Sequence, residues 1–298
     1  MGPGEQLRTL AIVLAALGAV ALAFGAQLQN DAVGHEKKNR AKGALSFKQM
    51  RSLLARPRWL SGTALMGIAI VFQLAALGLA PIIVVQPIGA IALVITSLVN
   101  ARVTKTKLSK ATIVAVALCT GGIGAFVAMA SGVAKEIELT DDRLREVLFV
   151  LVAILAVFGV LFIFFARRIN ALTYILGAGV LYGFVATLAK VVIQRMYQLQ
   201  FDWLTILCLI ALVAAVVLGG WFVQNAYSSG PPDLVIAGLT VIDPLVAVTV
   251  AIAILGEAKA ATPLVAVGFS LSAILAIAGV VLLSKVHPEL AAKKAARR

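Results

Sequence analysis

Long apolar segments separated by short polar connectors make up most of the chain. Nine segments reach the length, about 20 residues, that an α-helix needs to cross the hydrocarbon layer of a bilayer. They are residues 7–29, 59–79, 82–103, 111–131, 147–166, 172–194, 203–224, 234–255 and 264–284. The pattern predicts an all-α fold, a polytopic membrane helical bundle of about nine spans.

Composition supports this class. Of the 298 residues, 61% are hydrophobic and only 13% are charged, and the mean hydropathy is +1.03. A soluble domain of this size could not cover so much apolar surface. The first span is not expected to be a cleaved signal peptide, because Glu5 and Arg8 leave the preceding region nearly neutral and its apolar run is long.

The connectors between the predicted spans differ in the sign of their charge. The formal net charge is +13, and Lys and Arg gather in the 30–58 connector, after the third and fifth spans, and in the basic tail 285–298. With nine spans these groups share one side, while the acidic loop 135–146 lies on the other. The positive-inside rule then places the N-terminus outside and the C-terminus in the cytoplasm, and we expect a bacterial plasma membrane. The basic charge predicts contact with membrane lipids, and no nucleic-acid partner is expected.

The 30–58 connector is the only long polar stretch. Ser46 begins a short amphipathic pattern with apolar Phe47, Met50, Leu53 and Leu54 on one face. This pattern is typical of a helix lying on the cytoplasmic leaflet, and a soluble linker helix is the alternative.

The two halves of the chain resemble each other. A shift of 157 residues aligns Val84–Gly122 with Val241–Gly279 without a gap and places Gln86-Pro87 on Asp243-Pro244. We therefore interpret residues 1–298 as one membrane domain with a 4+1+4 arrangement. It comprises a first repeat at 7–131, a connecting span at 147–166 and a second repeat at 172–284. The single connecting span makes the second repeat enter the membrane in the opposite direction, as in many secondary transporters.

Asp243 is the most informative polar residue, because it is the only acid predicted in the middle of a span. It lies nine residues after Leu234, or roughly 14 Å along a helix, near the centre of the bilayer. It has two interpretations: a proton or cation site, or a protonated residue hydrogen-bonded to a neighbouring helix. If a metal ion is bound, Asp243 is its predicted ligand. Pro87 and Pro244 predict helix breaks at the same depth.

Other polar residues at membrane depth are candidates for a transport site. Gln86 is predicted to face Asp243 across the repeat axis or to join neighbouring helices. Lys190 has three interpretations: pairing with Asp243, meeting an anionic substrate, or extending to the outer headgroups. Glu257 ends its span and is predicted to make a helix-end contact at the outer surface. A polar cavity is predicted to include Gln73, Gln224, Asn225 and Tyr227.

The sequence contains no P-loop, HExxH, CxxC or GxSxG motif, so no enzyme activity and no cofactor are predicted. Gly179-x-x-x-Gly183 permits close helix packing, although such pairs are common in membrane helices.

Two stretches carry a family resemblance. QPIGAIALVITSLVNARVTKTKLSKATIVAVALCTGGIGAFV and its echo GPPDLVIAGLTVIDPLVAVTVAIAILGE resemble the drug/metabolite transporter superfamily, also called EamA-like. The span count and the basic connector after span one resemble its NIPA-type magnesium-transporter branch. The resemblance covers about Leu10 to Ser284, and it implies paired inverted repeats and transport by alternating access. Asn100 stands where a symmetric pattern would place a second glutamate, matching Glu257.

The leading hypothesis is secondary transport of a small polar solute or cation, Mg²⁺ among them. The alternatives are a flippase for an anionic or polyprenyl-linked lipid, with Lys190 and Arg195 receiving phosphate groups, and a non-transporting membrane scaffold. A homodimer is left open.

Overall fold

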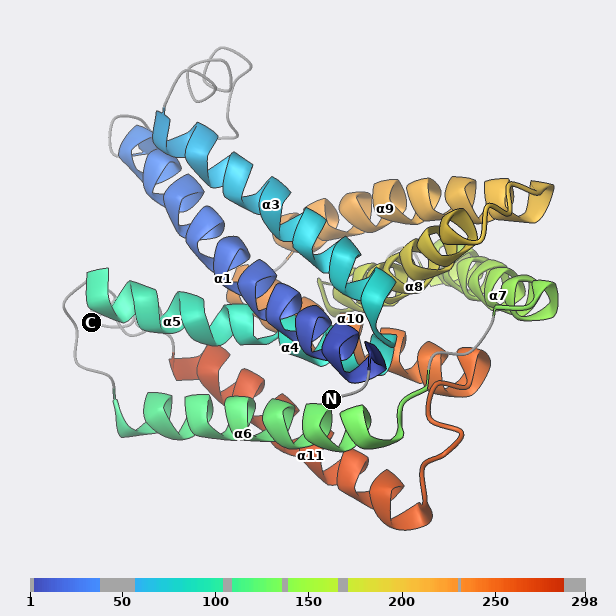
Figure 1. Cartoon of the computed structure of the whole chain (residues 1–298). Helices are drawn as coiled ribbons and strands as arrows, with labels where there is room; N and C mark the ends of the chain where they lie inside the picture. Colours follow the sequence, from blue (N-terminus) through green and yellow to red (C-terminus); the bar gives the residue numbers. More distant parts are fainter. Residues whose placement is uncertain are drawn as a thin grey trace.

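The computed structural model describes residues 3–37, 57–103, 109–135, 139–165, 171–229 and 232–286. The predicted connector helix at 46–54 and the tail beyond Val286 lie outside these ranges. The described residues form the helices α1 (Pro3–Lys37), α3 (Pro57–Leu79), α4 (Ile82–Gly89), α5 (Ile91–Val103), α6 (Lys110–Val133), α7 (Asp141–Phe165), α8 (Ala171–Tyr197), α9 (Trp203–Ser229), α10 (Pro232–Val250), η2 (Ala251–Leu255) and α11 (Pro263–Val286) (Figure 1).

Each predicted span coincides with a helix or with two consecutive helices, so the all-α fold is confirmed. Eight segments of the described chain are long and apolar enough to cross a membrane. The fifth predicted span is α7, which is not among these eight segments. It has both Asp141 and Asp142 in its first turn. The first helix extends to Lys37, eight residues beyond the predicted end.

The two proline-bearing spans differ in their backbone. The third span is interrupted at Ala90, whose N–H donates to the Pro87 carbonyl at 3.2 Å, and it resumes as α5. The eighth span instead continues as α10 through Pro244 and changes into the π-helix η2 only at Ala251. The predicted break at Pro244 is therefore displaced by seven residues. A lipid environment favours keeping every remaining backbone hydrogen bond, because no water replaces a lost one.

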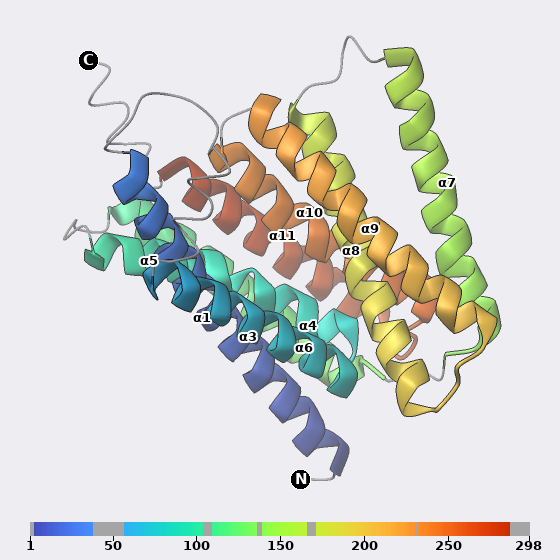
Figure 2. The ribbon, with the colours of Figure 1, turned by 90° about the horizontal axis from the view of Figure 1, so that it is seen from above.

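Four helix pairings build the bundle. The α1 helix packs along α3, α6 along α11, and α8 along both α9 and α10 (Figures 1 and 2). Viewed from above, α7 lies at the edge of the bundle on the side of α9 (Figure 2). The core between these helices is apolar and includes Phe184, Leu181 and Leu77.

The α6 and α11 helices approach each other through glycines. A Cβ atom on Gly122 would lie 2.6 Å from the Ala276 nitrogen, and one on Gly279 would lie 2.3 Å from the Cys119 nitrogen. Both distances are shorter than any ordinary contact, so the two backbones pack at a separation that only glycine allows.

One end of the bundle gathers many helix termini, and we call it the Glu257 end. Glu257, just after η2, contacts the start of α4, and the Lys135 N–H after α6 donates to the Glu257 carbonyl at 3.1 Å. Arg8 near the start of α1 donates to the carbonyls of Ser131 and Ala134. These contacts require consecutive spans to run in alternating directions, as the nine-span prediction expects.

Candidate functional site

The Asp243 carboxylate lies inside the bundle on α10. Its Oδ1 atom is enclosed and has no hydrogen-bond partner among the described residues. An unpaired carboxylate oxygen in an apolar interior is costly. The sequence also allowed a protonated carboxyl hydrogen-bonded to a neighbouring helix, and Oδ1 makes no such bond among the described residues.

Two glycines of α8 receive the Asp243 segment. A Cβ on Gly179 would lie 2.6 Å from the Ile242 Cβ, and one on Gly183 would lie 2.7 Å from the Val246 Cβ. The Gly179-x-x-x-Gly183 pair thus lets α10 pack tightly on α8 on both sides of Asp243. The sequence pattern predicted close packing at this glycine pair but did not identify α10 as the helix that packs there.

A cavity of about 70 Å³ lies beside this segment. Its lining comes from α4, α6, α10 and α11, and both Pro87 and Pro244 contribute to it. The remaining lining is almost entirely apolar: Ala90, Ile123, Phe126, Thr240, Val241, Leu245, Val248, Ala273, Ala276, Ile277 and Val280. The two proline-bearing helices therefore line one cavity. The sequence had predicted that Pro87 and Pro244 lie at the same depth.

The predicted polar residues are not gathered around this cavity. Gln86 is buried on α4, with 7% of its surface exposed, and Gln73 is half-buried on α3. On α9, Gln224 is exposed and Asn225 donates from Nδ2 to the Trp221 carbonyl of its own helix at 2.8 Å. Tyr227 also belongs to α9, but its side chain lies outside the described structure. Within the described residues, none of these side chains lines the cavity, and Asp243 is not part of its lining either.

Lys190 is held at the corner between α3 and α4. Its ammonium donates to the carbonyls of Leu77 at 3.3 Å and Ala80 at 2.6 Å, and lies 3.9 Å from Oε1 of Glu257. Both charged side chains are 3% exposed. Burial excludes the extension of Lys190 to the headgroups. Glu257 makes the helix-end contact that the sequence predicted. The contact lies in the interior and not at the outer surface, because the N-terminus of α4 meets the Glu257 carboxylate there.

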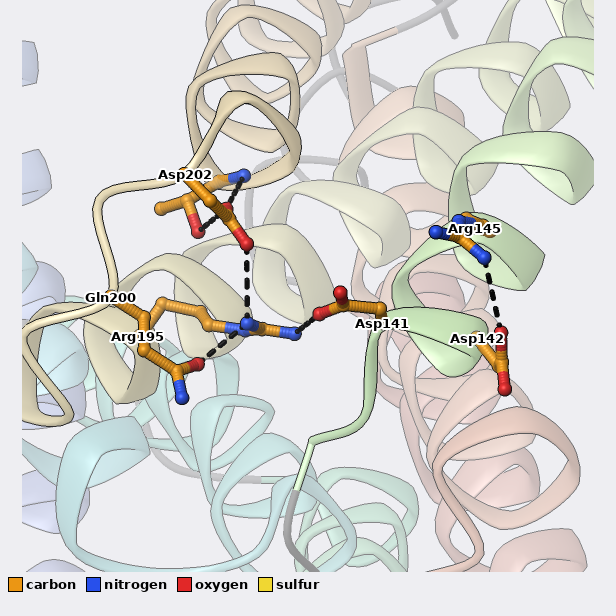
Figure 3. Close-up of polar contacts among 7 residues, drawn as sticks. Asp141, Asp142, Arg145, Arg195, Gln200 and Asp202 are labelled. Atoms are coloured by element: carbon orange, nitrogen blue, oxygen red, sulfur yellow. Dashed lines mark hydrogen bonds and ion pairs between the residues drawn. The ribbon is translucent and has the colours of Figure 1, made fainter.

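A second charged group lies at the same end of the bundle. Arg195 of α8 donates to Asp141 at 2.5 Å and to Gln200 at 2.5 Å, and lies 3.6 Å from Asp202 (Figure 3). Hydrogen bonds from the Thr205 hydroxyl and backbone N–H, with the nearby Arg195 charge, hold the pKa of Asp202 below its ordinary value of 3.8. The group fastens α7 to the turn between α8 and α9.

No cluster of three or more His, Cys, Asp or Glu side chains able to hold a metal ion occurs in the described ranges. A cation at Asp243 would thus take its other ligands from backbone carbonyls, amide oxygens or its own water molecules.

The comparisons with known proteins identify the family. The model of the magnesium transporter NIPA family matches residues 7–226, most of the chain. The chain belongs to the NIPA magnesium transporter family. It is also 25% identical over 257 residues to an uncharacterized protein of Corynebacterium glutamicum, covering 85% of this chain and 86% of that protein. No solved structure matches. Membership in this family, together with the apolar helices, makes the chain an integral membrane protein of a magnesium-related transporter family.

Proposed function

We propose that the chain is a secondary transporter that moves Mg²⁺ by alternating access, with Asp243 as the carboxylate that the cation meets inside the membrane. The observation that carries this proposal is the enclosed Oδ1 atom of Asp243, which has no partner among the described residues. A carboxylate in this position is neutral or bound to a cation during at least part of a transport cycle.

The ligand inventory suits a partly hydrated cation. Mg²⁺ loses its water shell reluctantly and is often held by one or two carboxylates while it keeps several waters. One acid at mid-membrane depth, with the carbonyls freed at Pro87 and Pro244, satisfies this mode of binding. The name of the family supports the choice of Mg²⁺ over an organic solute.

Reciprocal contacts support an arrangement of inverted repeats. Gly122 lies against Ala276 and Gly279 lies against Cys119. The sequence offset of 157 residues converts the first contact into the second, since it maps 122 onto 279 and 119 onto 276. Two identical surfaces meeting around a two-fold axis make contacts of this kind. The same offset relates Pro87 to Pro244 and Ile123 to Val280, and all four line the cavity. We place the axis through the α6–α11 contact and assign the fold to the drug/metabolite transporter superfamily.

Charge placement supports an orientation. The Glu257 end carries Asp141 and Asp142 at the start of α7, whereas Arg58, Arg102 and Lys110 lie at the other ends of their helices. We place the Glu257 end outside a plasma membrane and the basic end in the cytoplasm.

The contacts of Lys190 and Arg195 favour cation transport over the flippase alternative. Lys190 is bound to Glu257 and two carbonyls, and Arg195 is bound to Asp141 and Gln200 with its side chain 4% exposed. Neither cation is directed at a lipid phosphate.

The test is Mg²⁺ uptake into proteoliposomes loaded with a fluorescent magnesium indicator. Asp243→Asn should reduce gradient-driven uptake by at least about tenfold, and Asp243→Glu should retain part of it. Asp142→Asn is the matched control, because it removes a carboxylate whose side chain is 90% exposed, and it should transport normally. Full uptake by Asp243→Asn would overturn the role of Asp243, and absent uptake by the unmodified protein would overturn Mg²⁺ as cargo.

A further inference from the structure

The corner between α3 and α4 is held from both sides by one buried ion pair. The α3 helix ends at Leu79 and α4 begins at Ile82, so the corner exposes the last carbonyls of one helix and the first N–H groups of the next. Lys190 satisfies the carbonyls of Leu77 and Ala80. Glu257 accepts from the Ile82 N–H at 3.0 Å and the Ile83 N–H at 2.9 Å. Lys190 places its positive charge at the C-terminus of α3, and Glu257 places its negative charge at the N-terminus of α4. These are the signs that the two helix termini favour.

The pair connects parts of the chain that are distant in sequence. Lys190 comes from α8, and Glu257 follows η2. Two further contacts reach the same segment: the Lys135 N–H donates to the Glu257 carbonyl, and Arg143 of α7 donates to the Leu255 carbonyl. Helices from both halves of the chain, and the connecting helix α7, are therefore joined at one point. Relative movement of these helices would therefore separate the pair.

Buried apolar side chains lie along α4 and η2 between the cavity lining and the pair. The lining of the cavity ends at Pro87 on α4 and at Val248 on α10. Between these residues and the pair lie Ile82, Val85 and Ala251, all with 0% of their surface exposed, and Leu255, with 2% exposed. All four side chains belong to the apolar core of the bundle.

We propose that the Lys190–Glu257 pair is the gate that closes the transport pathway at the Glu257 end and must separate for a cation to pass there. This inference rests on the proposed transport function and adds its gating residues. The structure is then a conformation with this gate shut.

The chemistry of the pair suits a gate. In the dry interior the two charges and four backbone groups satisfy one another, so the closed conformation is well defined. When the helices part, water hydrates both charges and the exposed helix ends, which limits the cost of opening. An apolar contact in the same place would gain nothing from entering water.

The experiment measures access to the cavity and does not depend on transport. The buried Cys119 and Cys208 are replaced by Ala, and the cavity residue Val248 is changed to Cys as a reporter. Membrane vesicles of each orientation are treated with a membrane-impermeant thiol reagent, and the labelling rate is measured from each face. Lys190→Met, Glu257→Gln and the double variant are compared with Arg145→Gln, which breaks the exposed pair to Asp142 at the same end of the bundle.

Labelling from the Glu257 face should become at least about tenfold faster in the three gate variants and remain unchanged in Arg145→Gln. The double variant is decisive, because it leaves no unpaired buried charge and is the least prone to misfold. An unchanged rate in the double variant would overturn the gate, and so would equal acceleration from both faces, which indicates general loosening. Failure of the proposed function would be seen separately, as absent Mg²⁺ uptake by a protein whose gate still responds in this assay.

Discussion

Pro87 and Pro244 line the same cavity, although they are 157 residues apart in the chain. Each belongs to a helix that crosses the bundle beside the other, and each removes one backbone hydrogen bond from the cavity wall. The wall therefore lacks two backbone hydrogen bonds where the two halves of the chain meet.

Filling the cavity should block transport without destabilising the fold. Ala90 lines it and has an ordinary right-handed helical backbone at the end of α4, so Ala90→Leu can add apolar volume there. We expect unfolding stability to stay constant or rise by about 0.5–2 kcal/mol while Mg²⁺ uptake falls by at least about tenfold. Ala125→Leu, on an exposed face of α6, is the control, and normal uptake by Ala90→Leu would show that the cavity does not change size during transport.

Adding one methyl group at the α6–α11 contact should destabilise the protein. Gly279→Ala and Gly122→Ala place a Cβ against the backbone of the facing helix, and overpacking of this kind costs about 1–3 kcal/mol. Thermal unfolding in detergent measures the effect. Gly121→Ala is an internal reference, since nothing lies within 4 Å of its Cβ position. Equal melting temperatures for Gly121→Ala and Gly122→Ala would contradict the close approach.

The two arginine–aspartate pairs in Figure 3 should differ in their contributions to stability. Arg195 is 4% exposed and Arg145 is 59% exposed. Arg195→Met removes buried, charge-assisted hydrogen bonds and should cost about 2–3 kcal/mol, whereas Arg145→Met should cost less than about 0.5 kcal/mol. Chemical denaturation of the purified variants measures both, and losses of similar size would be inconsistent with the burial of Arg195.

Asp202 should make part of the stability depend on pH. Because its pKa is lowered in the folded state, its contribution is present above the unfolded pKa and is lost as the pH falls through the folded pKa. The melting temperature should therefore fall on acidification below about pH 3.8. Asp202→Asn retains an oxygen for the Thr205 N–H but no charge, so its melting temperature should fall less. Asp142→Asn serves as the control and should follow the unmodified protein, and an unaltered acid response in Asp202→Asn would refute this assignment.

The span count could be predicted from sequence because hydrocarbon thickness sets a minimum length for each apolar run. The partner of Lys190 could not be predicted in the same way. Glu257 lies 67 residues further along the chain, and only the packing of α8 on α3 and of η2 on α4 brings the two together. A signal was present nonetheless: Glu257 ends an apolar span and follows a glycine, a position where an acid can reach the N-terminus of another helix.

The backbone at the two prolines shows a second limit of sequence patterns. Pro87 and Pro244 align in the repeat, yet only the first lies close to a helix interruption. Proline determines which hydrogen bond is lost, while the neighbouring helices determine whether the axis breaks. At Pro244, the close packing of Ile242 and Val246 on the α8 glycines supports the helix on both sides of the lost bond.

The π-helix η2 contains wider turns than an α-helix, and Gly256 ends it in a left-handed conformation with φ of 74°. Each residue of an α-helix rotates the next side chain by about 100° around the axis, and the i→i+5 bonding of a π-helix changes that angle. Removing one residue between Ala251 and Leu255 would turn Glu257 away from α4. The direction in which the Glu257 side chain points thus depends on the helix type of the preceding five residues. A change in the pitch of these residues would rotate Glu257 about the helix axis with no substitution in the sequence.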